Sequence, residues 1–165
     1  MRYKQLGGIT TVSDTALPAP DGPITRTFEA DGAIPVGTAV TVDFASDATG
    51  KLVIQADAAL DHRQVVGIYA GVGGTGAAAT VSGTSGKAAV DGDIIEVVTY
   101  GVAYALQDGT TDTVPGEALA IEATTGYLIG GITAVTNGTA NAMLFTCMEA
   151  VTTDGAAGRV YVKCM

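Results

Sequence analysis

Short runs of aliphatic and β-branched residues recur along this chain, and Gly, Asp-Gly, Asn-Gly and Thr-Gly turn signals separate them. We find no window of ten or more positions in which apolar residues recur at the three- and four-residue spacing of an amphipathic helix. The intervals between turn signals, about 8 to 12 residues, are typical of a β-sandwich or small barrel. The pattern therefore predicts a mainly β protein: a small β-sandwich/barrel-like domain with an extended N-terminal arm and little helix.

The strongest expected strand is 94–106, in which Gly101 predicts a bulge or bend. Residues 36–55 predict a hairpin, and 56–64 is the only locally helical or turn-like stretch that we expect. The expected strands are 36–44, 51–55, 65–72, 94–106, 118–123, 127–136, 142–148 and 159–164.

The chain has 165 residues, the size of one domain or of two small lobes that share a core. We expect residues 1–25 to form an extended arm and 26–165 to form a single β-rich domain. Three of the five prolines lie within 17–23, and proline does not donate to a β-ladder. Two interpretations stay open: a frayed terminus, or an arm that becomes ordered on a neighbouring subunit.

Residues 73–90 are rich in Gly, Ala and Ser, with Val81 as the one bulky anchor, and predict a long mobile loop or a surface lobe. An internal repetition links 33–72 to 114–148. Both contain Gly-x-Ala-aliphatic-x-aliphatic-acid followed by Thr-Gly-x-Leu-aliphatic. Two pseudo-repeated hairpin units explain this similarity, and chance in so simple a composition is the competing explanation.

The charge balance limits the partners of the chain. Eight Lys and Arg against seventeen Asp and Glu give a net charge of −9, whereas a nucleic-acid groove needs clustered cations. No apolar run approaches the roughly 18 residues of a membrane span. The basic first residues lead into 6–11 without an apolar core segment, so we expect no secretory signal. We therefore expect neither nucleic acid nor membrane as a partner.

Residues that resemble parts of active sites do not form a complete one. His62 follows Asp61 directly, whereas members of a catalytic triad usually lie far apart in sequence. Ser82 and Ser85 lie in a glycine-rich segment without a nucleophile elbow. Glycoside cleavage needs a pair of carboxylates, and this chain offers five candidates. Most of them lie at strand positions that we expect to face outward. The candidates are Asp43, Glu96, Glu117, Glu122 and Glu149.

Ligand-binding patterns are equally incomplete. Residues 91–93, Asp-Gly-Asp, offer two carboxylates where a calcium loop needs about five oxygen ligands. The glycine run 71–76 lacks the Lys-Ser/Thr of a phosphate-binding loop. One histidine with Cys147 and Cys164 falls short of the four ligands of structural zinc, although the two cysteines could form a bridge between adjacent strands. We expect no enzyme, no cofactor, no metal and no catalytic residue.

The strand-turn formulas resemble one known family. Ala33–Val42, then Thr49-Gly50-Lys51-Leu52 and Asp57–Ile68 are followed by Gly92–Val102, which has the form Gly-Asp-x-aliphatic-x-Val-x-x-x-Gly-Val. Together they are similar to the capsid decoration, or cement, proteins of tailed bacteriophages. The resemblance covers roughly 33–106, with a looser match after 116, and the segment 73–90 departs from the compact members.

The resemblance implies a β-rich structural virion protein, usually a homotrimer, that binds the major capsid protein on the outer surface of the shell. It would be made in the host cytoplasm and would stabilise the shell against internal DNA pressure. A trimer that binds several sites of a symmetric shell at once is held strongly, even if each single contact is weak. Two alternatives remain: another virion part (head fibre base, tail tube or minor head protein), or a bacterial surface or carbohydrate-binding β-module.

Overall fold

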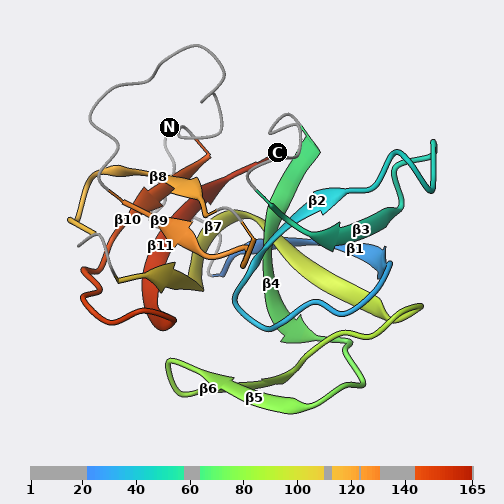
Figure 1. Cartoon of the computed structure of the whole chain (residues 1–165), viewed down its shortest axis with the longest axis horizontal. Coiled ribbons are helices and arrows are strands. Elements are labelled where there is room, and N and C mark those ends of the chain that lie inside the picture. The colour runs from blue at the N-terminus through green and yellow to red at the C-terminus, as the bar shows by residue number, and fades with distance from the viewer. Residues whose placement is uncertain (1–21, 58–63, 110–112, 123, 131–143, 165) are drawn as a thin grey trace, which may run out of the picture.

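The computed structural model describes residues 22–57, 64–109, 113–122, 124–130 and 144–164. Strands make up about half of these residues and helix is almost absent from them, so the mainly β expectation is confirmed (Figure 1). The strands are β1 (Ile24–Ala30), β2 (Ala39–Val42), β3 (Leu52–Gln55), β4 (Val65–Val72), β5 (Ala78–Val81), β6 (Thr84–Lys87), β7 (Ile94–Asp108), β8 (Ala118–Ile121), β9 (Leu128–Ile129), β10 (Phe145–Cys147) and β11 (Ala156–Lys163). Within the described ranges, no helix has the length and apolar character that crossing a bilayer requires.

Nine strands form one mixed sheet, in the order β1-β3-β2-β4-β7-β11-β10-β8-β9. The additional pairings β1–β7 and β7–β9 close this sheet on itself twice. We call the closed set β1, β3, β2, β4 and β7 ring one, and the closed set β7, β9, β8, β10 and β11 ring two. In Figure 1 ring two lies on the left and ring one on the right. Each ring is a small barrel, and closure leaves neither one with a free sheet edge.

The long strand β7 belongs to both rings. Its first part, Ile94–Tyr100, pairs with β1, and β4 pairs with residues inside that part. Its second part, Tyr100–Gln107, pairs with β11. Gly101 lies where β7 passes from one ring to the other and has a φ of +104°, a backbone conformation that favours glycine. The bend expected at Gly101 coincides with this junction.

The two rings have the same pairing pattern. In ring one, β1 pairs parallel with β3, β3 pairs antiparallel with β2, and β2 pairs antiparallel with β4. In ring two, β7 pairs parallel with β9, β9 pairs antiparallel with β8, and β8 pairs antiparallel with β10. β7 closes ring one by pairing antiparallel with β1. β11 closes ring two by pairing antiparallel with β7.

Glycines with positive φ recur at equivalent places in the two rings. Gly37 and Gly116 precede β2 and β8 with φ of +86° and +96°. Gly50 and Gly126 precede β3 and β9 with φ of +75° and +70°. The first of the two hairpin units predicted from sequence falls on ring one, whereas part of the second, 131–143, lies outside the described residues.

Two clusters of buried side chains fill the rings. One contains Val40, Val53, Tyr69 and Val97, all fully buried within ring one. The other is centred on Phe145 in ring two, and it also includes side chains from the strands of ring one. Those contributed side chains are Ala39, Val65, Ile68 and Val98. The two rings therefore share apolar packing as well as a strand.

Two segments differ from the sequence-based expectation. Residues 73–90, predicted as a long mobile loop or a surface lobe, contain the hairpin β5–β6, whose Val81 is buried and packs in the core cluster of ring one. Ser82 and Gly83 at its tip both have positive φ, as a two-residue hairpin turn requires. Residues 24–30 form β1, although no strand was expected there and 24–25 were assigned to the arm.

The remaining strands appear near their expected positions and are mostly shorter, because only the paired residues at the centre of each run enter a ladder. The strand expected at 127–136 is limited to β9 within the described residues. Residues 1–21 of the expected arm, and most of the turn expected at 56–64, lie outside the described residues.

Candidate functional site: turn carboxylates and an apolar groove

The five carboxylates considered for glycoside cleavage are dispersed over the structure. Glu96 is exposed on β7, and Glu149 pairs with Arg159. Glu117 accepts a hydrogen bond from the backbone N–H of Val114 at 2.9 Å. The other two, Asp43 and Glu122, accept hydrogen bonds within turns. The structure thus brings no pair of them together as a reactive site, and four of the five hold turns or an ion pair in place.

A carboxylate and a threonine organise the equivalent hairpin turns of the two rings. The Thr49 hydroxyl donates to Asp47 at 2.5 Å, and the Thr125 hydroxyl donates to Glu122 at 2.5 Å. The hydroxyl and the backbone N–H of Thr49, together with the backbone N–H of Lys51, lower the pKa of Asp47 to about 2. The turn carboxylates therefore serve as hydrogen-bond acceptors that shape the loops.

Asp93, which the sequence placed in a possible calcium loop, joins two segments of the backbone. Its Oδ2 accepts hydrogen bonds from the N–H groups of Val90 and Thr75, each at 2.8 Å. These bonds hold the pKa of Asp93 below its usual value, the Val90 bond most strongly. In the described residues, no group of three or more His, Cys, Asp or Glu side chains is placed to hold a metal.

We predict that Asp93→Ala releases the segment around Thr75 without unfolding the chain. Amide hydrogen exchange at Thr75 and Val90 should accelerate, because both N–H groups lose their acceptor. The folded-state pKa of Asp93 is lowered, so its stabilising contribution is present above the unfolded pKa near 3.8 and is lost as pH falls through the lowered value. The difference in melting temperature between the two proteins should therefore shrink at acidic pH. An equal difference at pH 7 and pH 2 would contradict this account.

The glycines in 71–76 permit close backbone approach. A Cβ at Gly73 would lie 2.1 Å from the Ile94 carbonyl oxygen, and one at Gly74 would lie 2.3 Å from the Tyr69 hydroxyl. The Tyr69 hydroxyl donates to the Lys87 carbonyl at 2.6 Å and so ties the buried ring of Tyr69 to β6. These contacts account for the glycine run through packing, without a bound phosphate.

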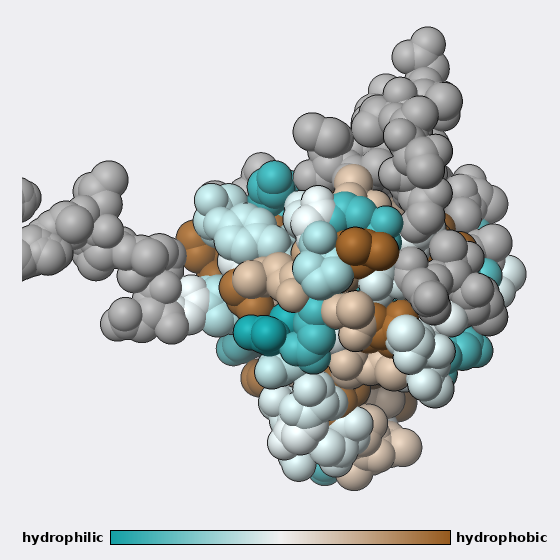
Figure 2. All heavy atoms as spheres, turned by 90° about the vertical axis from the view of Figure 1, so that its left-hand side faces the viewer, coloured by the Kyte–Doolittle hydropathy of each residue, from teal (hydrophilic) through white to brown (hydrophobic). Residues whose placement is uncertain are grey.

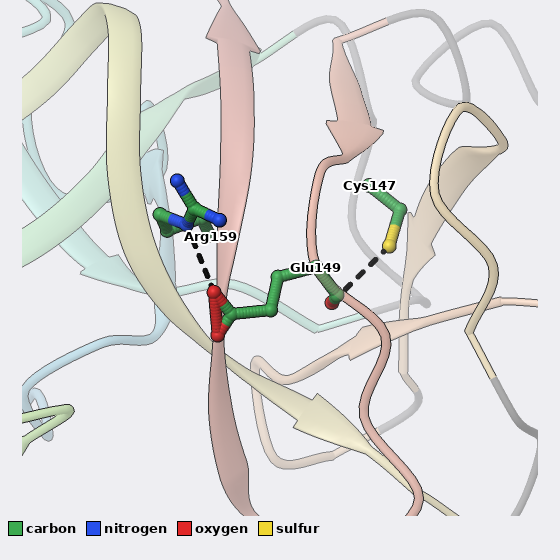
Figure 3. A network of polar contacts seen from close by, with 3 residues as sticks. All are labelled: Cys147, Glu149 and Arg159. Carbon is green, nitrogen blue, oxygen red and sulfur yellow. Dashed lines mark hydrogen bonds and ion pairs between the residues drawn. The ribbon is translucent and has the colours of Figure 1, made fainter.

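Arg159, Glu149 and Cys147 form a polar network along β10 and β11 of ring two (Figure 3). Arg159 Nε donates to Glu149 Oε1 at 2.8 Å, which raises the pKa of Arg159. The Cys147 thiol donates to the Glu149 backbone carbonyl at 3.4 Å. Cys147 and Cys164 are both free, so the bridge that the sequence left open does not form.

We predict that neither thiol reacts with a disulfide reagent at pH 8 while the chain is folded. Cys147 is buried, and burial raises the pKa of Cys164 to about 12. A thiol with that pKa is about one part in 10⁴ ionised at pH 8, against about one quarter for an ordinary cysteine. Both thiols should react promptly in denaturant. Rapid reaction of one thiol without denaturant would contradict this expectation.

An apolar groove lies between the hairpin β5–β6 and the middle of β7. Its walls carry Pro23, Thr84, Val102 and Tyr104, and its volume is about 170 Å³. Further lining residues are Val36, Ala70, Val81, Val98 and Ala103. Sequence analysis did not find this groove, because its residues come from five segments that only the fold brings together.

Other apolar side chains are exposed at separate places. Phe44 is 51% exposed in the β2–β3 turn, and Met148 is 39% exposed after β10. Val72 and Ile94, on neighbouring strands of ring one, are exposed by 51% and 58%. Figure 2, which views the ring-two side, shows small hydrophobic areas interspersed with hydrophilic ones over the described part of that face. Single exposed apolar residues of this kind are normal for a protein surface.

The described residues thus define a class of fold: two five-stranded closed β units that share one long strand. No protein-family model matches the chain, and no curated protein matches it. Among solved structures, the chain is similar in fold to "The crystal structure of head fiber gp8.5 N base in bacteriophage phi29". The TM-score is 0.50 at 10% sequence identity, over 86% of this chain and 94% of that chain.

Proposed function

We propose that this chain is a structural component of a bacteriophage head. One observation carries the proposal: the likeness to the phi29 head fibre base covers 86% of this chain and 94% of the other. A match of that extent includes both rings. The resemblance of residues 33–106 to capsid decoration proteins, which rests on strand-turn formulas in the sequence, supports the same part of a virion.

The specific role that we propose is a decoration, or cement, trimer on the outer surface of the capsid. Its partners would be two further copies of the chain and the major capsid protein, and its role would involve neither catalysis nor nucleic acid. Closed rings suit such a role, because they leave no sheet edge for uncontrolled pairing in a crowded surface layer. The net charge of −9 would keep neighbouring copies soluble and apart.

A head fibre base is the second candidate, and the same structural likeness favours it equally. The two roles differ in what lies above the domain: a fibre base carries an extended fibre, whereas a cement protein ends near the shell. A bacterial surface or carbohydrate-binding module is a weaker third candidate, because the chain has no Trp and few aromatics for sugar platforms.

Light scattering and electron microscopy test the proposal together. The purified chain should have about three times its mass of 16.4 kDa in solution. Mixed with bare shells of the phage that encodes it, the chain should add saturable density at three-fold positions, and shells already carrying it should take up no more. A strict monomer that leaves bare shells unchanged would refute both head roles. Antibody labelling of intact virions then distinguishes them, since the label lies flush with the shell for a cement protein and at fibre roots for a fibre base.

A further inference from the structure

The apolar groove lies directly beside the point at which the described chain begins. Pro23 forms part of its wall, and the Pro23 Cα lies 3.1 Å from where a Cβ of Gly101 would be. The described chain therefore begins at the rim of the groove. The groove has an apolar floor, in which Val36, Val81 and Val98 are all at least nine-tenths buried. Water gains few hydrogen bonds on such a surface, so an apolar occupant is favoured.

The sequence immediately before Pro23 has the chemistry of such an occupant. Residues 15–20 read Thr-Ala-Leu-Pro-Ala-Pro and contain no charged side chain. Proline-rich segments are pre-ordered in the extended polyproline form, and they dock on apolar grooves lined by aromatic residues. Tyr104 supplies an aromatic ring in the wall. A cavity of about 150 Å³ holds a benzene-sized apolar group, so the groove, at about 170 Å³, is large enough for the Leu17 side chain.

The residues directly before Pro23 also have the sequence pattern of a turn. Ala19-Pro20-Asp21-Gly22 has proline at the second and glycine at the fourth position, the pattern of a type I turn. Gly22 itself is a bend. A turn at this place would allow the residues before it to fold back toward the groove of the same chain. The short connection gives this segment an effective concentration that a neighbouring molecule does not match.

From these observations we propose that the groove binds residues 15–18 of its own chain, with Leu17 as the anchor. The groove is then an intramolecular docking site for a proline-rich peptide, and it fixes where the N-terminal arm leaves the domain. This inference does not depend on the virion role, because it concerns only contacts within one chain.

Disulfide trapping in the full-length chain tests the proposal. Ala16→Cys combined with Thr84→Cys places one thiol beside the anchor and one in the wall of the groove. The control pair is Ala16→Cys with Ala48→Cys, whose second thiol is exposed in the turn between β2 and β3. The native thiols do not interfere at pH 8, because Cys147 is buried and the pKa of Cys164 is about 12. We expect at least tenfold more cross-link within one chain for the groove pair than for the control pair.

Each other outcome overturns the proposal. Covalent dimers from a mixture of the two single variants, Ala16→Cys and Thr84→Cys, would show that the groove holds the arm of a neighbouring copy. Equal yields from the groove pair and the control pair would show that residues 15–18 do not occupy the groove.

A matched pair of substitutions gives a second, independent readout. Val102, in the wall of the groove, and Val90, outside it, are 40% and 41% exposed, so a glutamate side chain at either position can reach water. Val102→Glu should accelerate elastase cleavage after Ala16 about tenfold, which corresponds to a loss of about 1.4 kcal/mol in docking. Val90→Glu should leave the cleavage rate unchanged. Equal cleavage rates for the two variants would overturn the proposal.

Discussion

Gly67→Ala should destabilise the fold by about 3 kcal/mol or more, the largest effect that we expect from a single added methyl group. Gly67 lies in β4 with a φ of +152°, and a Cβ there would lie 2.0 Å from the Val98 carbonyl oxygen. That oxygen belongs to the backbone of β7, the strand that both rings share. A side-chain rotation cannot relieve the clash, so β4 and β7 would have to separate. Urea unfolding followed by circular dichroism measures the loss.

Gly92→Ala is the matched control for that substitution. Gly92 has a φ of +85°, and nothing lies within 4 Å of its added Cβ. This substitution should lower the free energy of unfolding only by the strain of placing alanine in a left-handed conformation, about 1–2 kcal/mol. Equal losses for Gly67→Ala and Gly92→Ala would show that close strand approach at Gly67 does not contribute to stability.

Phe145→Ala should destabilise the protein by about 3–5 kcal/mol, the usual range for truncating a buried aromatic side chain. Phe145 is fully buried in ring two, where it pairs with Leu119 on β8 and Val162 on β11. Because Ile68 of ring one belongs to the same apolar cluster, the substitution should destabilise both rings. Thermal unfolding should remain a single transition at a lower temperature.

Phe44→Ala serves as the control, since Phe44 is 51% exposed and its truncation should change stability by only about 0.5 kcal/mol. Amide hydrogen exchange reports whether the rings unfold together. In the Phe145→Ala variant, protection should fall in β2 and β3 of ring one as well as in ring two. Two separate melting transitions, with ring-one protection unchanged, would contradict the shared core.

Local sequence predicts much of the strand content for a clear physical reason. Alternation of Val, Ile and Thr with polar residues identifies a strand that buries one face, and Gly or Asp-Gly identifies where the chain turns. The segment 65–72 was predicted with the bounds that β4 has. The Thr-Gly turns before β3 and β9 follow from the same local chemistry, because the threonine and its acidic partner lie within three residues of each other.

Other features depend on partners far along the chain. Residues 24–30 become β1 because β7 and β3 offer ladders on both sides, and nothing in 24–30 itself identifies those partners. Residues 73–90 contain few bulky side chains, yet they form a hairpin because Val81 finds a buried site and Gly71 and Gly86 let the backbones approach. Composition alone therefore favoured a loop where the tertiary structure provides a packed hairpin.

The sequence by itself determined that this protein is mainly β, acidic and punctuated by glycine turns, because each of these properties depends on residues near one another in the chain. The tertiary structure decided how the strands close. The parallel pairs β1–β3 and β7–β9 join segments more than twenty residues apart, and they convert one sheet into two rings around a shared strand. The groove beside Pro23 likewise depends on the tertiary structure, since its walls come from five segments that are separate in the sequence. Long-range pairing is selected by the total burial of the folded chain, which no local pattern encodes.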